Sequence, residues 1–518
     1  MKNKSKKNGK VYLVGAGPGD PGLITLKGLR VLSLAEVLVY DRLVNERLLS
    51  YARPGAELIY AGKEPGCHTL DQDAIGMLLV EKALEGHIVT RLKGGDPFIF
   101  GRGGEEAALL AENGIPFEIV PGVTSAVSVP AYAGIPVTHR GMSSSFAVIT
   151  GHEEPGKNQS SIAWDKLAAG VDTLVFLMGM QNLPLITRQL LINGCSPATP
   201  VAVISWGTRP EQQTLTGNLQ DIVLKVQSFQ IPSPAVIVVG DVVSLHKKLG
   251  WFERKPLFGK RIVVTRSREQ AGDLSDKIEE LGGEPLEFPA IRIVPPADYT
   301  SLDRAMERIA GYDWLIFTSV NGVDFFFRRL RDRGRDIRDL KGLRLCAIGP
   351  RTRDALREKG LLVDYVPAEY RAEAVLKQLA GVLKPGERVL LPRADLAREV
   401  LPSTLLSRGA IVDNVEVYRT VQGDGDTRLL REMLAGGMIH MVTFTSSSTV
   451  RNFIQLLGSD FKELLCGVVL ASIGPVTSGT AREMGLEISV EAGEYTIDGL
   501  IKAVREFFEE NTLTGGTF

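Results

Sequence analysis

Residues 91–106 of this chain read RLKGGDPFIFGRGGEE. The stretch holds five glycines and a Gly-Asp-Pro corner, and it lies between an apolar run at 88–92 and a helix-like run at 105–113. Glycine lets the backbone approach a ligand where a Cβ atom would collide. Because ligands bind at the carboxyl ends of strands in open α/β sheets, the stretch predicts a ligand-binding loop. A tight strand-to-helix turn without a ligand is the alternative.

A second glycine-rich loop lies near the start of the chain. A short apolar run leads into GAGPGDPG at 15–22, where Asp20 followed by proline is a helix-start signal that predicts a helix over 22–35. A strand then ends at Asp41, so an acidic residue follows the glycine-rich loop after about 20 residues, as in a dinucleotide-binding fold. The spacing is GxGxG rather than GxGxxG, and Pro18 lacks the N–H that a pyrophosphate would use. An NAD-dependent oxidoreductase is therefore the less favoured alternative.

Strand-like and helix-like segments alternate through the first half of the chain. Further strands are predicted at 58–60 and 117–120, and a helix is predicted at 72–84. About five strands that alternate with helices in a lobe at 9–138 predict a mostly parallel sheet. Strand-like runs dominate residues 142–250, which form a second lobe.

Composition narrows the class of protein. A length of 518 residues predicts several domains, and a net charge of −1 gives no basic field for nucleic acid. The four cysteines are far apart and the histidines lack ligand spacing, so we expect reduced core thiols in a cytoplasmic protein and no metal site. No apolar stretch is long enough to span a bilayer, so no membrane partner is expected.

A junction separates the two halves. Residues 251–259 read WFERKPLFG, a charged segment with a proline between flanking glycines, and we interpret it as a linker. A new α/β unit begins at residue 260, and its first helix is predicted over 270–281.

The second half contains an internal repeat. FTSVNGV at 317–323 returns as FTSSSTV at 444–450. AIGPRT at 347–352 returns as SIGPVT at 472–477, at nearly the same interval. The repeat predicts two similar α/β lobes in which strands end in Thr/Ser- or Gly-rich turns.

The first half resembles a known family. GAGPGDPGLITLKG, VYDRLV and RLKGGDPFIFGRGGEE together resemble the tetrapyrrole methylases over 9–250, most nearly the uroporphyrinogen-III C-methyltransferases. Residues 260–505 resemble the uroporphyrinogen-III synthases. This resemblance rests on the internal repeat together with three further motifs, FPAIRI at 288–293, LLPRAD at 390–395 and VEVYRT at 415–420. The two resemblances imply a fusion of two α/β units with two lobes each.

The synthase resemblance also implies how the second unit is divided. One lobe would comprise residues 260–292 and 422–505, and the other would be inserted between them at 293–421. Two crossing strands, near 291–295 and 418–421, would connect the lobes.

The resemblance implies two activities. The second unit would cyclise hydroxymethylbilane to uroporphyrinogen III, and the first would methylate the product twice with S-adenosylmethionine to give precorrin-2. It also implies a homodimer formed through the methylase unit. A methyltransferase whose second half only binds tetrapyrrole is the alternative, and the sequence leaves open whether the product serves sirohaem or cobalamin.

The resemblance assigns a set of residues to the methyl donor. Asp96 can accept hydrogen bonds from ribose hydroxyls, and the glycines before it permit close approach. The expected donor-binding residues are Pro18, Gly94, Gly95, Asp96, Ile99, Thr124, Ser125, Met178 and Gly207. For Met178 and Gly207, roles as core and turn residues are the alternative.

Three residues are catalytic candidates. The resemblance implies that Asp41 accepts and Lys63 donates a proton in methylation, and Tyr418 is the candidate proton donor of the synthase. A substrate with eight carboxylates needs cations and hydroxyl donors. The expected substrate-binding residues are Arg91, Arg102, His139 and Arg140 on loops of the first lobe, and Thr318, Ser319, Thr352, Thr445 and Ser446 in the second half.

Overall fold

The computed structural model describes residues 9–62, 71–151, 162–367, 382–395 and 400–513. The chain forms two compact units, one of Met1–Gly259 with Leu281–Gly283 and one of Lys260–Glu280 with Glu284–Phe518. Each unit contains two five-stranded sheets. No helix in the described ranges is both long and apolar enough to cross a membrane.

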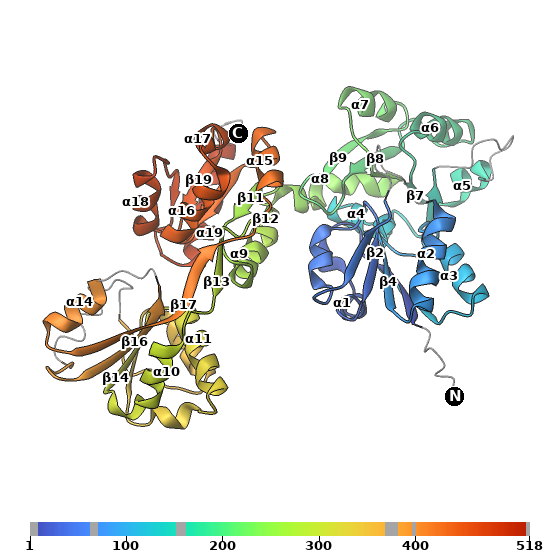
Figure 1. Ribbon diagram of the computed structural model, residues 1–518. Helices are drawn as coiled ribbons and strands as arrows, with labels where there is room; N and C mark the ends of the chain where they lie inside the picture. Colours follow the sequence, from blue (N-terminus) through green and yellow to red (C-terminus); the bar gives the residue numbers. More distant parts are fainter. Residues whose placement is uncertain (1–8, 63–70, 152–161, 368–381, 396–399, 514–518) are drawn as a thin grey trace, which may run out of the picture. The chain divides into compact units, whose positions relative to one another are not determined.

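The first lobe of the first unit is a parallel sheet covered by helices (Figure 1). Its strands are β1 (Lys10–Gly15), β2 (Val37–Tyr40), β3 (Glu57–Tyr60), β4 (Ile88–Lys93) and β5 (Phe117–Val120). Its helices are α1 (Leu26–Leu32), α2 (Gln72–Leu84), α3 (Gly103–Glu112) and α4 (Ser125–Tyr132). Val11 and Leu13 pack against α2 and α3, whereas Val14 packs against α1. Both faces are buried, which explains the continuous apolar runs of the strands.

The strand order argues against the dinucleotide-binding alternative. The order is β3-β2-β4-β1-β5, and every pair is parallel, which confirms the predicted sheet. In the dinucleotide-binding fold the first two strands are neighbours. Here β4 lies between β1 and β2, so Asp41 and the loop after β1 do not have the relation that NAD requires.

The helix predicted over 22–35 is divided into two pieces. Asp20 accepts a hydrogen bond from the backbone N–H of Gly22 at 2.7 Å and caps a 3-10 turn, Pro21–Leu23. Thr25 then caps α1 by accepting from the N–H of Gly28 at 3.0 Å. The Asp-Pro start signal is confirmed, but the second cap interrupts the helix because its hydroxyl competes for the backbone.

The second lobe of the first unit is a mixed sheet. Its strands are β6 (Phe146–Thr150), β7 (Thr173–Leu177), β8 (Pro200–Ser205), β9 (Gln213–Asn218) and β10 (Ala235–Val239), in the order β6-β7-β10-β8-β9. Its helices are α5 (Trp164–Gly170), α6 (Leu183–Ile192), α7 (Ile222–Ser228) and α8 (His246–Leu249). Helix α4 joins the two lobes, because Ala126 and Val129 pack against Val175 and Ile204 of this sheet.

The segment interpreted as a linker is packed onto the first unit. The ring of Trp251 lies 5.0 Å from that of Tyr132, and its Nε1 donates to the carbonyl of Ala131 at 3.1 Å. Phe252 is buried, and Glu253 accepts from Thr214 at 2.5 Å. Residues 251–259 therefore complete the first unit rather than forming a free linker.

The second unit also has two lobes (Figure 1). The strands of the first are β11 (Arg261–Val264), β12 (Glu284–Glu287), β18 (Met441–Phe444), β19 (Val469–Ser472) and β20 (Val490–Glu491). Its helices are α9 (Arg268–Glu280), α15 (Thr427–Ala435), α16 (Ser447–Leu457), α17 (Phe461–Leu464), α18 (Pro475–Glu483) and α19 (Ile497–Leu513). All pairs in this sheet, ordered β12-β11-β18-β19-β20, are parallel.

The inserted lobe is connected by two strands, one short and one long. Its strands are β13 (Ile291–Val294), β14 (Trp314–Phe317), β15 (Arg344–Ala347), β16 (Arg388–Ala394) and β17 (Ile411–Gln422), in the order β13-β17-β16-β14-β15. Its helices are α10 (Thr300–Glu307), α11 (Val320–Asp332), α12 (Pro350–Glu358) and α14 (Val400–Ser407). The pairing of β13 with β17 is antiparallel, from Ile291 opposite Gln422 to Val294 opposite Arg419, at the predicted crossing.

The internal repeat is a repeat of structure. Strand β14 leads through Ser319 into α11, and β18 leads through Ser446 into α16. Both serines cap their helices, since Ser319 accepts from the N–H of Gly322 at 3.1 Å and Ser446 from that of Thr449 at 3.2 Å. The matching Gly-Pro turns begin α12 and α18.

The described cysteines differ in their burial. Cys346 is buried, Cys195 is half-buried and Cys466 is exposed, and all three are free thiols. The prediction of core thiols is therefore wrong for Cys466.

Candidate functional site

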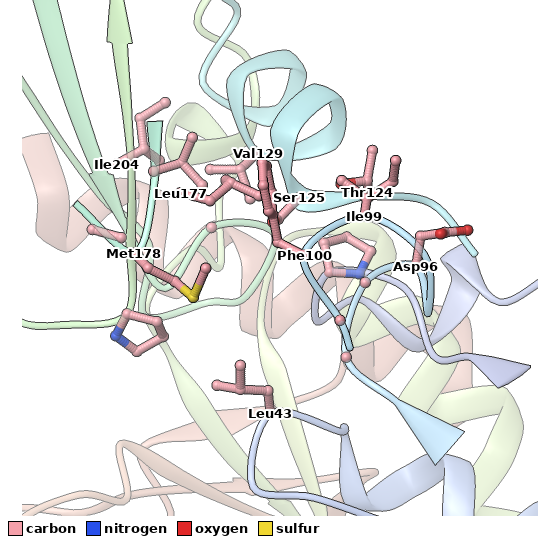
Figure 2. A pocket seen from close by; sticks show the side chains of 18 of the residues that line it. Leu43, Asp96, Ile99, Phe100, Thr124, Ser125, Val129, Leu177, Met178 and Ile204 are labelled. Atoms are coloured by element: carbon pink, nitrogen blue, oxygen red, sulfur yellow. The ribbon is translucent and has the colours of Figure 1, made fainter. Parts of the chain in front are cut away.

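One pocket of the first unit collects residues from both lobes (Figure 2). They lie at or after the ends of β1, β2, β4, β7 and β8, in or directly before α4, or at the start of β10, so the pocket lies where the two lobes meet. The nine residues expected to bind the methyl donor all line it: Pro18, Gly94, Gly95, Asp96, Ile99, Thr124, Ser125, Met178 and Gly207. Figure 2 shows the carboxylate of Asp96 on one side of the pocket and the thioether of Met178 on the other.

Close backbone contacts build the floor of this pocket. Gly17 and Gly95 exchange backbone hydrogen bonds, at 2.7 Å and 3.2 Å. A Cβ atom on Gly15 would lie 2.5 Å from the Cα of Gly122, and one on Gly122 would lie 2.3 Å from the carbonyl oxygen of Gly95. Asp96 ties the same loops together, because its Oδ2 accepts from the N–H of Gly122 at 3.0 Å. Only glycine fits where these loops touch.

The pocket wall contains strained backbone. Phe100, Met178 and Trp206 line the pocket and have φ values of 53°, 56° and 47°. The left-handed region is unfavourable for residues with a Cβ, and such conformations gather at functional sites. A Cβ on Gly207 would lie 2.3 Å from the side chain of Val129, so this glycine lets the second lobe approach α4.

A buried polar cluster lies behind the loop. Glu106 is fully buried, and its Oε1 accepts from Lys93 at 2.7 Å, from Gln72 at 3.0 Å and from Arg91 at 3.4 Å. Arg91 also reaches Asp41, with 3.5 Å between Nη2 and Oδ2. Burial, followed by the nearby Arg91 charge, lowers the pKa of Lys93.

The cluster corrects one prediction. Arg91 lies in β4 with a side chain only 4% exposed, not on a loop, and its guanidinium is engaged by Glu106 and by two backbone carbonyls. It therefore holds Asp41 rather than facing a substrate in solvent. Asp41 follows β2, is 26% exposed, and accepts from the N–H of Leu43 at 3.2 Å.

The other cationic candidates of the first unit are exposed. Arg102 begins α3 with a φ of 57° and pairs with Glu105 at 2.6 Å. His139 and Arg140 lie in an exposed turn in which His139 pairs with Ser143. Lys63 lies outside the described residues.

The candidates of the second unit are distributed over both lobes. In the inserted lobe, the hydroxyl of Tyr418 lies 3.1 Å from Oγ of Ser319, and burial raises the pKa of Tyr418. Thr318 is half-buried beside Ser319, and Thr352 is buried in the first turn of α12. The remaining two, Thr445 and Ser446, lie in the other lobe, after β18.

Sequence reasoning missed several pocket residues. Trp206, Phe100 and Leu43 line the pocket, and Arg209 donates to the carbonyl of Leu43 at 3.0 Å. A signal for Trp206 was present, since WGT directly follows an apolar strand. The positive φ values had no such signal. Among the described residues, no group of His, Cys, Asp or Glu side chains is placed to hold a metal ion.

Two family models match the chain. The model of the tetrapyrrole (corrin/porphyrin) methylases matches residues 10–223, and that of uroporphyrinogen-III synthase HemD matches residues 272–502. Across nearly its whole length the chain is similar to a porphyrin biosynthesis protein HemD of Ruminiclostridium josui. The identity is 41%, over 96% of this chain and 98% of that protein.

Relatives of the first unit alone are more similar. A uroporphyrinogen-III C-methyltransferase of Priestia megaterium is 58% identical, over 46% of this chain and 99% of that protein. An S-adenosyl-L-methionine-dependent uroporphyrinogen III methyltransferase of Methanosarcina barkeri is 52% identical, over 47% of this chain and 95% of that protein.

Proposed function

The chain belongs to the tetrapyrrole methylase family in its first half and to the uroporphyrinogen-III synthase family in its second. We propose that the two units catalyse two successive reactions of tetrapyrrole biosynthesis. The second unit cyclises hydroxymethylbilane to uroporphyrinogen III. The first unit transfers two methyl groups to that product, giving precorrin-2. The observation that carries the proposal is the convergence of nine residues from distant loops on one pocket.

The pocket suits S-adenosylmethionine as the methyl donor. When bound, this donor supplies a methyl group from its sulfonium. Ile99, Leu177 and Ile204 offer an apolar slot for a ring, and Asp96 offers carboxylate oxygens to hydroxyls. The glycine-built floor leaves space and backbone groups for the rest of the molecule. Among the described residues that line the pocket, Arg209 is the one cation, so a positively charged donor meets little repulsion.

Asp41 is the proposed proton acceptor of the methylation. It stands at the carboxyl end of β2, two residues before the pocket residue Leu43. Arg91 and the N–H of Leu43 hold the carboxylate in place, which suits a general base that must meet one substrate proton. Lys63 remains the proposed proton donor.

The macrocycle is proposed to lie at the exposed rim of the pocket. Phe98, Ile99, Phe100 and Met178 are each between 43% and 53% exposed there. Such a patch on a soluble protein marks a binding surface, and it suits the flat apolar body of a tetrapyrrole. The side chains of Arg102, His139 and Arg140 are proposed to receive carboxylates. The patch could instead be shared with a second copy in a homodimer, which the mass in solution would reveal.

Tyr418 is the proposed proton donor of the synthase. Cyclisation requires loss of a hydroxyl, and burial keeps the phenol protonated by raising its pKa. Ser319 positions the phenol. The residues proposed to donate hydrogen bonds to substrate carboxylates lie on both lobes and are Thr318, Thr352, Thr445 and Ser446. In the alternative, the second unit only binds tetrapyrrole.

The test is incubation of the whole chain with hydroxymethylbilane and S-adenosylmethionine, with the mass and isomer of the product measured. We expect the type III isomer carrying two added methyl groups. A fragment of residues 260–518 that cyclises hydroxymethylbilane no faster than buffer would favour the binding alternative. Dimethylation of supplied uroporphyrinogen III would separately establish the first activity.

A further inference from the structure

The loop after β11 carries an arginine that forms no ion pair with the described residues. Arg266 lies at the carboxyl end of a central parallel strand, directly before α9. Its Nη2 donates to Oε1 of Gln270 at 3.1 Å, a neutral partner. Its Nε is buried and has no hydrogen-bond partner among the described residues. The adjacent Ser267 is 1% exposed, and its hydroxyl is likewise unpartnered within the described ranges.

The surroundings make this charge costly. Burial, and then repulsion from Arg351, lowers the pKa of Arg266 to about 10. The nearby carboxylate of Asp273 is already paired with Arg351 at 2.6 Å. No carboxylate lies within ion-pair distance of Arg266 in the part of the chain that the structure describes. Arg266 is half-buried with its Nε enclosed, and a desolvated cation without an ion-pair partner destabilises a fold, so an anion at this point would relieve the cost.

The position connects the two lobes. Gln270, which holds Arg266, donates from Nε2 to Oδ1 of Asn321 at 3.0 Å, and Asn321 opens α11 of the inserted lobe. Burial raises the pKa of Tyr418, and Asn321, which also lies near its phenol, acts to lower that pKa by a smaller amount. Arg266 is thus two side chains removed from the proposed proton donor, across the boundary between the lobes.

We propose that Arg266, with the hydroxyl of Ser267, binds a carboxylate of the linear tetrapyrrole substrate between the lobes of the second unit. The inference rests on the proposed synthase activity. A guanidinium accepts a carboxylate with two parallel hydrogen bonds, and the unpartnered Nε is available for one of them. Because Gln270 connects the guanidinium to Asn321, which lies near Tyr418, the bound carboxylate places the substrate near the proton donor.

The test is the steady-state cyclisation of hydroxymethylbilane by the full chain. Arg266→Gln should raise KM by about tenfold or more, the loss expected for a charge-assisted hydrogen bond to a buried partner. The change in kcat should be smaller, because the carboxylate is held in both the ground state and the transition state. Arg266→Lys keeps the charge but not the two-bonded geometry, so its KM should lie between those of Arg266→Gln and the unchanged chain.

The matched control is Arg338→Gln. Arg338 has a side chain 87% exposed and pairs with Asp336, so its loss removes the same charge from the same unit without disturbing Arg266, Gln270 or Asn321. A folded Arg266→Gln chain with KM within twofold of the unchanged chain would overturn the inference. If that variant fails to fold, an unchanged KM of Arg266→Lys would overturn it. If the unchanged chain yields no type III isomer above the spontaneous reaction, the synthase proposal itself fails.

Discussion

The two units bring their candidate residues together in different ways. In the first, backbone forms the site: glycines touch glycines, three wall residues adopt positive φ, and nine candidates share one pocket. In the second, the candidates are side chains on two lobes connected through β13 and β17. Two of these, Ser319 and Ser446, already cap helices. A site made of backbone should fail completely when one glycine gains a side chain, whereas a site made of side chains should lose function by degrees.

The largest effect is expected at Gly95. Its φ is +67°, it exchanges backbone hydrogen bonds with Gly17, and it lines the pocket. Gly95→Val places a branched side chain into the ligand space and should abolish S-adenosylmethionine binding, measured by calorimetry. The control is Gly55→Val, since Gly55 has a φ of +83° and nothing within 4 Å of an added Cβ. Both variants carry backbone strain of about 1–2 kcal/mol. Equal loss of binding in both would therefore mean that strain, and not the side chain in the pocket, causes the loss, and the contrast between a backbone-built and a side-chain-built site would not hold.

The next effect concerns chemistry rather than binding. Asp41→Asn should lower kcat of methylation by about 10² or more, the range for a lost general base. The affinity for S-adenosylmethionine should be unchanged, because an amide oxygen can still accept from the N–H of Leu43. Asp71→Asn is the matched control, since Asp71 caps α2 through the N–H of Ala74. A drop of less than threefold at Asp41, with a lower melting temperature, would reduce its role to that of a structural residue.

In the second unit a smaller loss is expected. Tyr418→Phe should lower kcat of cyclisation about tenfold, below the usual range for a general acid, because Ser319 and Asn321 remain beside the ring. The control is Tyr312→Phe, which leaves Asp413 without its hydroxyl partner at 2.5 Å and should cost stability but not turnover. A loss at Tyr418 as large as that at Asp41 would mean that one side chain dominates this unit as well.

The contrast also explains what the sequence could predict. Residues 91–106 are contiguous, and their glycines report directly on backbone shape, so the pocket and its nine residues followed from pattern and resemblance. Tyr418 and Ser319 are 99 positions apart, and nothing local marks their contact. The sequence also could not indicate whether the side chain of Arg91 points towards the substrate or into the protein. A cation beside a glycine loop suggests a substrate contact, but both faces of β4 are covered, and Glu106, fifteen positions later, turns the charge inward.

The junction was misread for a related reason. The charges, proline and flanking glycines of residues 251–259 suggested a linker, whereas Trp251, Phe252 and Phe258 form an aromatic cluster with Tyr132. The aromatic residues of this short charged segment were the available signal that it packs against the first unit. Its charges do not prevent such packing, because long charged side chains can cover apolar surface while their ends remain in water. Lys255, for example, lies over the ring of Trp251 at 5.2 Å.

The smallest effect tests whether this junction belongs to the first unit alone. Trp251→Ala removes ring contacts with Tyr132 and Phe252 and a hydrogen bond, together about 1–2 kcal/mol, since the ring is 44% exposed. In a calorimetric scan of the full chain, the melting temperature of the first unit should fall by about 2–8 °C. The transition of the second unit should stay in place, because these contacts of Trp251 are with residues of the first unit. Phe229→Ala, at a residue 66% exposed, is the control and should shift neither transition. A shift of both transitions after Trp251→Ala would show that the two units unfold together, and the contrast between their sites would then lie within one cooperative structure.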